Sequence, residues 1–150
     1  MVSEATGFWD SSALVPLCIH ETKTSRARAC LRRFRPVIWW GSFLEVYSAI
    51  CRVHHAGEMS DLDKSSAVRR LRQISGTWRE IAPDDRVRDL AMQSLDKYSL
   101  RAADGLQLAA ALVWCAERPA RRNFICADHR LAQAASLAGF SVVELFSAAR

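Results

Sequence analysis

The sequence predicts an α/β fold in which helices cover a parallel sheet. Short runs rich in β-branched and aromatic residues alternate with longer segments of helical period, and no repeat or low-complexity segment interrupts them. Parallel strands need long connections, which helices provide. The chain has 150 residues, of which 50% are hydrophobic, so we expect a single domain with one core over residues 1–150.

Local patterns predict the elements of the first half. The segment that opens at Ser42 has apolar residues at helical spacing from Phe43 to Val53, and Ser60 and Asp63 form a capping sequence for the next helix. In order, we expect a strand at 6–9, a basic helix at 23–34, a strand at 37–40, a helix from 42 and a helix at 60–75.

The second half continues the alternation. Residues 101–116 are rich in alanine and leucine and apolar nearly all round, which predicts a buried helix, and Gly139 is a typical helix stop. We expect a short strand at 80–82, helices at 83–98 and 101–116, a strand at 123–126, a helix at 128–138 and a last strand at 141–145.

Composition argues against several classes of protein. The longest apolar stretch, residues 108–116, is much shorter than the roughly twenty residues of a membrane-spanning helix, and residues 1–4 do not resemble the start of a secretory signal. Five cysteines without C-x-x-C spacing fit neither a disulfide framework nor a zinc site, and predict reduced thiols in a cytoplasmic protein. Because neither G-x-x-x-x-G-K-[ST] nor G-x-G-x-x-G occurs, we expect no nucleotide cofactor.

The chain is basic, with a formal net charge of +5 at pH 7. A small basic protein typically has a polyanion or an acidic protein as its partner. Three groups of arginines are candidates for nucleic-acid contact, although solvated helix faces explain each group equally well. They are Arg26, Arg28, Arg32, Arg33 and Arg35; Arg69, Arg70 and Arg72; and Arg118, Arg121 and Arg122.

Four acidic residues follow strands or open helices in this pattern. Asp10 and Asp128 come after predicted strands, and Glu45 and Asp104 lie in the first turns of predicted helices. The carboxyl ends of parallel strands and the N-termini of the helices that follow them share one edge of a sheet, where ligands bind in open α/β folds. We therefore expect these four acids to converge on one rim.

Taken singly, each acid also fits a local structural role. Asp10 can accept hydrogen bonds from the turn that follows it, and Asp128 can cap the helix that it begins. Glu45 fits a capping box with Ser42, and Asp104 can interact with the positive end of its helix dipole.

A purely structural role explains Asp104 least well, because this residue shares a face with Leu108 and Ala111 on a helix with almost no polar side. A charge on such a helix is costly unless another group pairs with it. Two carboxylates about 4 Å apart repel by roughly 4 kcal/mol at an effective dielectric constant near 20, so a cluster of such acids requires cations. Oxygen ligands without a nearby set of histidines favour Mg²⁺ or Mn²⁺ over zinc. Magnesium held by carboxylates is suited to the hydrolysis of phosphodiesters.

Four blocks of the sequence resemble the PIN-domain ribonucleases, specifically the VapC toxins of bacterial toxin–antitoxin pairs. Residues 9–15, WDSSALV, resemble the family's D-[ST]-S-A-L-[VI], and residues 43–50, FLEVYSAI, resemble its E-V-x-x-A-[LI] helix. Residues 100–109, LRAADGLQLA, are very close to L-R-A-x-D-A-[LI]-[HQ]-L-A, and residues 124–131, FICADHRL, resemble F-[VL]-T-x-D-x-[RK]-L. The blocks occur in the family's order and at its usual spacings.

The resemblance implies a PIN-like three-layer α/β/α domain with a central, mainly parallel sheet. It also implies a catalytic, metal-binding quartet for Mg²⁺ or Mn²⁺, composed of Asp10, Glu45, Asp104 and Asp128. Behind the quartet, Ser12 and Cys126 are the expected supporting residues. Candidates for RNA contact are Arg101, His129 and Arg130.

The activity implied by the resemblance is that of an endoribonuclease toxin that leaves a 3′-hydroxyl and a 5′-phosphate. A VapB-type antitoxin would neutralise it, and a homodimer is the expected assembly. Two residues depart from the family pattern: Cys126 replaces a usual threonine or serine, and Gly105 replaces a common alanine at a cost of roughly 1 kcal/mol of helix propensity.

These departures leave a second interpretation open, a catalytically weak PIN-like module that binds RNA or regulates without cutting it. A phosphoryl-transfer domain with Asp10 as an aspartyl nucleophile is disfavoured, because Ser12 occupies the position of the usual second aspartate.

Overall fold

One parallel sheet organises residues 5–146, the part of the chain that the computed structural model describes. Its strands are β1 (Ala5–Trp9), β2 (Phe34–Trp39), β3 (Arg79–Ile81), β4 (Asn123–Cys126) and β5 (Ser141–Glu144). Within this range the strand order is β3-β2-β1-β4-β5, and every neighbouring pair runs parallel. The predicted parallel sheet is therefore confirmed. Residues 1–4 and 147–150, the ends of the predicted domain, lie outside the described residues.

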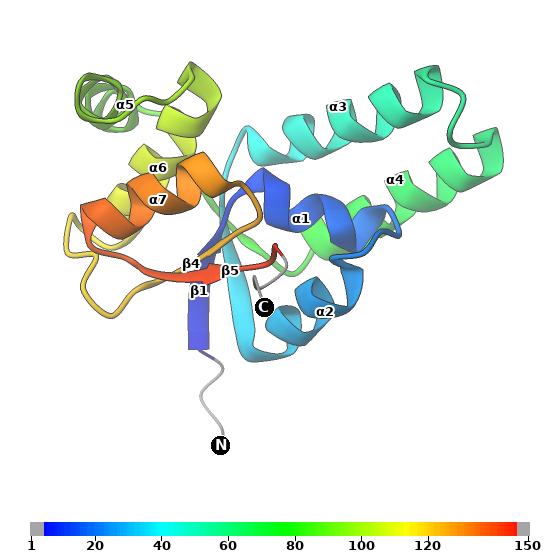
Figure 1. Ribbon diagram of the computed structural model, residues 1–150, viewed down its shortest axis with the longest axis horizontal. Helices are drawn as coiled ribbons and strands as arrows, with labels where there is room; N and C mark the ends of the chain where they lie inside the picture. Colours follow the sequence, from blue (N-terminus) through cyan, green and yellow to red (C-terminus); the bar gives the residue numbers. More distant parts are fainter. Residues whose placement is uncertain (1–4, 147–150) are drawn as a thin grey trace.

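Helices cover both faces of the sheet (Figure 1). They are α1 (Ser11–Cys18), α2 (Thr24–Arg33), α3 (Ser42–His55), α4 (Asp61–Ser75), α5 (Asp85–Lys97), α6 (Ala102–Trp114) and α7 (His129–Ala138). Side chains alternate along a strand, so neighbouring residues contribute to opposite layers. Phe8 and Phe124 pack with α5, α6 and α7, whereas Trp9 and Ile125 pack with α1 to α4. The result is the expected three-layer α/β/α arrangement.

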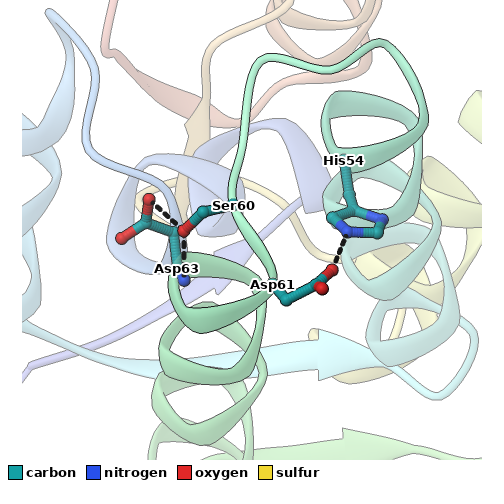
Figure 2. A network of polar contacts seen from close by, with 4 residues as sticks. All are labelled: His54, Ser60, Asp61 and Asp63. Atoms are coloured by element: carbon teal, nitrogen blue, oxygen red, sulfur yellow. Dashed lines mark hydrogen bonds and ion pairs between the residues drawn. The ribbon is translucent and has the colours of Figure 1, made fainter.

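Helices α3 and α4 form a hairpin that extends away from the sheet (Figure 1). The predicted cap of α4 is present, because the Ser60 hydroxyl accepts a hydrogen bond from the N–H of Asp63 at 3.1 Å. Close by, Nε2 of His54 at the end of α3 lies 2.6 Å from Oδ1 of Asp61 (Figure 2). These contacts hold the turn between the two helices.

Two segments differ from the sequence-based expectation. The sequence analysis predicts no element over residues 11–18, yet α1 forms there and buries Leu14 and Leu17 against the core, although Pro16 lacks the N–H that a helix interior needs. Strand β2 begins at Phe34 rather than at residue 37 and contains Pro36. Proline is tolerated there because β3 pairs with β2 only from Val37 onward, which leaves Pro36 at an open edge.

No helix within residues 5–146 has the length and apolar character needed to cross a membrane. All five cysteines are unpaired in this part of the chain, in agreement with the predicted reduced thiols. Cys18, Cys115 and Cys126 are buried, where a thiol packs as a small apolar side chain.

Candidate active site

The carboxyl edge of the sheet contains a cleft of about 550 Å³. Its lining includes Asp10, Glu45, Asp104 and Asp128. Asp10 directly follows β1 and Asp128 follows β4, while Glu45 and Asp104 lie in the first turns of α3 and α6. The parallel topology thus brings together four acids that are up to 118 positions apart in the sequence. Their roles in catalysis and metal binding stay predictions.

Asp10 is the most deeply buried of the four, with 2% of its surface exposed. Asp10 caps α1, which is the local structural role that the sequence allowed for it. Its carboxylate accepts hydrogen bonds from the Ser12 N–H at 3.3 Å and from the Ser12 hydroxyl at 2.8 Å. Burial raises the pKa of Asp10 to about 7, against the lowering effect of these hydrogen bonds. Asp10 is therefore a buried carboxyl whose hydrogen-bond donors are neutral.

Glu45 does not form the predicted capping box. Gly41 occupies the cap position of α3 without a side-chain hydrogen bond, and the buried Ser42 hydroxyl accepts one from Nε2 of Gln107 at 2.9 Å. The Glu45 carboxylate accepts hydrogen bonds from the Ser11 hydroxyl at 2.7 Å and from Nε2 of Gln107 at 3.2 Å. It is thus held between α1 and α6, rather than turned back onto its own helix.

Asp128 and Asp104 differ in how they are held. Asp128 caps α7, because its Oδ1 accepts a hydrogen bond from a backbone N–H of the first turn at 2.8 Å. The half-buried Asp104 carboxylate accepts no hydrogen bond within residues 5–146. Burial, and then the charges of Asp128 and Glu45, raise the pKa of Asp104, while Arg101 and Arg130 lower it.

Repulsion between the carboxylates raises the pKa values of two of them. Asp128 raises the pKa of both Asp10 and Asp104, and Glu45 adds to the effect on Asp104. Within the described residues, no three His, Cys, Asp or Glu side chains are close enough to hold one metal ion as they stand. The donor set, which is all oxygen and includes a buried carboxylate, fits Mg²⁺ or Mn²⁺ chemically. The ligand geometry stays a prediction.

Ser12 lines the cleft beside Asp10, and the buried Cys126 contacts both Ser12 and Asp128. Besides donating to Asp10, the Ser12 hydroxyl accepts a hydrogen bond from the N–H of Ala127 at 2.9 Å and lies 3.9 Å from the Cys126 sulfur. The same sulfur contacts the backbone N–H of Asp128 at 3.4 Å. Burial, and then the Asp10 charge, raise the pKa of the Cys126 thiol well above its usual range. A neutral thiol therefore occupies the place where the family pattern has a hydroxyl.

Gly105 has a packing role. It is buried in α6, and a Cβ at this position would lie 3.0 Å from Cδ2 of Leu95 on α5. Glycine therefore allows α5 and α6 to approach closely. An alanine at this position would require Leu95 to move by a few tenths of an ångström.

The predicted RNA contacts do not line this cleft. Arg101 is the exposed cap residue of α6, and Arg130 is exposed in the first turn of α7. Both are close enough to lower the pKa of Asp104. The His129 ring packs against Phe146, with the ring centroids 3.6 Å apart. Contact of these residues with RNA stays a prediction.

Three further residues of the site are not singled out by the sequence analysis. Ser11 and Gln107 hold Glu45, and Arg52 lines the cleft and donates a hydrogen bond to a serine on its own helix. Helical spacing is the signal that identifies two of them: Arg52 lies two turns after Glu45, and Gln107 lies one turn after Asp104.

Comparison with known proteins finds solved structures with a similar fold. No family model and no curated protein matches the sequence. A toxin–antitoxin complex from Klebsiella pneumoniae matches with a TM-score of 0.66 and 16% identity, over 95% of this chain and 100% of that chain. PAE2754 from Pyrobaculum aerophilum matches with a TM-score of 0.63 and 15% identity, over 97% of this chain and 93% of that one. FitAcB from Neisseria gonorrhoeae matches with a TM-score of 0.61 and 16% identity, over 89% of this chain and 96% of that one.

Identities this low show similarity of fold alone. The matches nevertheless extend over nearly the whole of both chains, and the parallel sheet and the three layers agree with what the four sequence blocks imply. The chain has the PIN-like three-layer α/β/α fold.

Proposed function

We propose that the protein is a metal-dependent endoribonuclease and the toxin of a toxin–antitoxin pair. The observation that carries the proposal is the convergence of four carboxylates, from four separate segments, in one cleft of a protein with net charge +5. Such a cleft suits a cation and a phosphodiester together, since the surrounding positive charge attracts the polyanion. The four sequence blocks, and the fold shared with the Klebsiella toxin–antitoxin complex, support the toxin assignment.

Asp10, Asp104 and Asp128 are the residues that would hold Mg²⁺ or Mn²⁺ in this cleft. The cation would polarise the phosphodiester and lower the pKa of the attacking water. Ser12 orients Asp10 through its hydroxyl and N–H, so that this carboxylate does not have to reorganise on binding.

Glu45 and Arg52 complete the proposed mechanism from α3. The Glu45 carboxylate, held by two hydrogen bonds from other helices, is the group that we assign to receive the proton of the attacking water. Arg52 supplies a positive charge on the same wall of the cleft, which suits a contact with a phosphate of the RNA.

The test is cleavage of structured RNAs by the purified protein in Mg²⁺, in Mn²⁺ and in EDTA, with the new ends sequenced. We expect cleavage in either metal, none in EDTA, and products with a 3′-hydroxyl and a 5′-phosphate. Cleavage that EDTA does not affect would overturn the mechanism. RNA binding without turnover in both metals would instead establish the weak, regulatory module.

The proposed antitoxin and dimer have separate tests. A short reading frame directly upstream is expected to encode a VapB-type protein, and adding that protein should suppress RNA cleavage. Sedimentation of the toxin alone is expected to give the mass of a homodimer. A monomer would contradict the dimer without affecting the nuclease.

Gln107 is a positioning residue, and replacing it by leucine is expected to lower kcat by about 10- to 100-fold, which is part of the roughly 10²- to 10⁴-fold that a well-positioned general base contributes. The physical reason is the loss of the Nε2 donor that holds Glu45. The KM for RNA should stay within about two-fold, because Gln107 is buried and Glu45 binds no RNA in this mechanism.

Gln107→His provides the rescue, because the family pattern accepts either residue at this position and imidazole can also donate a hydrogen bond. Gln93→Leu, at an exposed position on α5, is the matched control. Equal losses of kcat in Gln107→Leu and Gln107→His, with unchanged thermal unfolding, would contradict the positioning role.

A further inference from the structure

A second cleft, of about 510 Å³, lies at the opposite edge of the sheet, where the strands begin. Arg35, Arg79 and Arg122 line it together with Trp78 and Trp114, and we name it the arginine–tryptophan cleft. Arg35 lies near the start of β2, Arg79 opens β3, and Arg122 immediately precedes β4. The cleft is thus separated from the carboxylates by the length of the strands, roughly 15–20 Å at 3.3 Å per residue.

The charge of this cleft is entirely positive. No acidic residue is among the lining residues, and none of the three arginines forms an ion pair within residues 5–146. Guanidinium groups gathered without counter-charges repel one another. Their planar donors match the oxygens of a phosphate, which would relieve that repulsion.

The two indoles supply flat apolar surfaces beside these charges. Trp78 packs edge to face against Phe43, with centroids 6.4 Å apart and planes at 83°, which holds the indole in place. The guanidinium carbon of Arg122 lies 5.7 Å from the centre of the Trp114 ring, so this arginine is held against the indole. Both indoles are partly exposed. Indole surfaces next to cationic groups are the combination that binds a base and its phosphate.

We propose that the arginine–tryptophan cleft binds a nucleotide, with the phosphate on the arginines and the base against an indole. Its volume lies within the usual range for small-molecule sites, about 300–1,000 Å³. The nucleotide can be free or part of an RNA chain, because the recognising chemistry is the same. The two arginine-rich segments at 26–35 and 118–122 each contribute one residue, and Arg79 comes from outside all three groups, so linear clustering does not identify this site.

The test is binding in EDTA, so that the result does not depend on cleavage at the carboxylates. AMP, inorganic phosphate and RNA oligonucleotides of about five and about ten nucleotides are titrated by calorimetry, and the indole N–H signals are followed by NMR. We expect AMP to shift the signals of Trp78 and Trp114, assigned from phenylalanine variants, and to leave the other indole signals in place. The double variant Arg79→Gln/Arg122→Gln should weaken binding at least about ten-fold, whereas Arg69→Gln, at an exposed position on α4, should not.

Chain length separates the two sources of the nucleotide. Equal affinity for AMP and for the oligonucleotides supports a free nucleotide, and affinity that rises with length and falls in the double variant supports an RNA chain. Unchanged binding in a folded double variant would overturn the proposal. Phosphate binding as tight as AMP binding, without indole shifts, would also overturn it and leave a simple anion site. Asp104→Asn should bind AMP like the wild type, so failure of the nuclease proposal is distinguishable from failure of this one.

Discussion

Asp104→Asn is expected to lower the rate of RNA cleavage about 1,000-fold while leaving the protein folded. Asp104 lines the cleft and is half-buried, and it accepts no hydrogen bond within the described residues. Burial and the charges of Asp128 and Glu45 raise its pKa, so the ionised carboxylate is held in an unfavourable environment. In our proposal, a cation relieves that repulsion. A cation contributes several kcal/mol to the transition state of phosphodiester hydrolysis, and a loss of about 4 kcal/mol corresponds to roughly 1,000-fold in rate.

Single-turnover cleavage in Mg²⁺ measures this effect directly. Asp96→Asn is the matched control, because Asp96 is exposed on α5 and lines no part of the cleft. Its cleavage rate should equal that of the wild type. Thermal unfolding of both variants should show that they are folded, and Asp104→Asn should be at least as stable as the wild type in EDTA because it removes a repelled charge. A cleavage rate within ten-fold of the wild type would exclude Asp104 from the catalytic site.

Asp10→Asn is expected to stabilise the protein in EDTA at pH 8, by up to about 4 kcal/mol in the free energy of unfolding. The pKa of the Asp10 carboxyl is about 7 in the folded protein, against an ordinary value of 3.8, and burial is the main cause. Above pH 7 the carboxyl is ionised in both states, so only the folded state bears the cost of a buried charge. The difference of about three pKa units, at 1.36 kcal/mol each, gives the upper limit.

The pH dependence of stability follows from the same upward shift in the pKa of Asp10. Between pH 7 and about 4 the folded protein keeps the Asp10 proton and the unfolded chain loses it, so wild-type stability rises as the pH falls through this window. The advantage of Asp10→Asn should therefore shrink from pH 8 to pH 4. Urea unfolding of both proteins at pH 8, 6 and 4 measures the difference.

Magnesium is expected to reverse the order of stability at pH 8, because a cation that binds only the folded wild type stabilises it by mass action. Magnesium should raise the stability of the Asp10→Asn variant only slightly. If Asp10→Asn is less stable than the wild type at every pH in EDTA, the hydrogen bonds from Ser12 outweigh the cost of burying the charge, and burial does not destabilise the ionised carboxylate.

The sequence by itself determined most of the local elements, although not α1, and the edge at which the acids meet. Ser60 caps α4 as predicted, and Gly139 ends α7 in the left-handed conformation, with φ of 112°. Both are properties of a few neighbouring residues. The meeting of Asp10 and Asp128 follows from a general rule, because every parallel strand ends at the same edge.

Only the tertiary structure decided which partners each side chain has. Glu45 fits a capping box in the sequence, but Ser11 and Gln107, distant in the chain, hold its carboxylate instead. Helix α1 forms despite Pro16, because burial of its apolar side against the core outweighs a local penalty. The arginine–tryptophan cleft likewise joins the starts of separate strands. Local pattern determines periodicity and caps, whereas long-range packing determines which segments meet and therefore which charges are paired, buried or left facing a cleft.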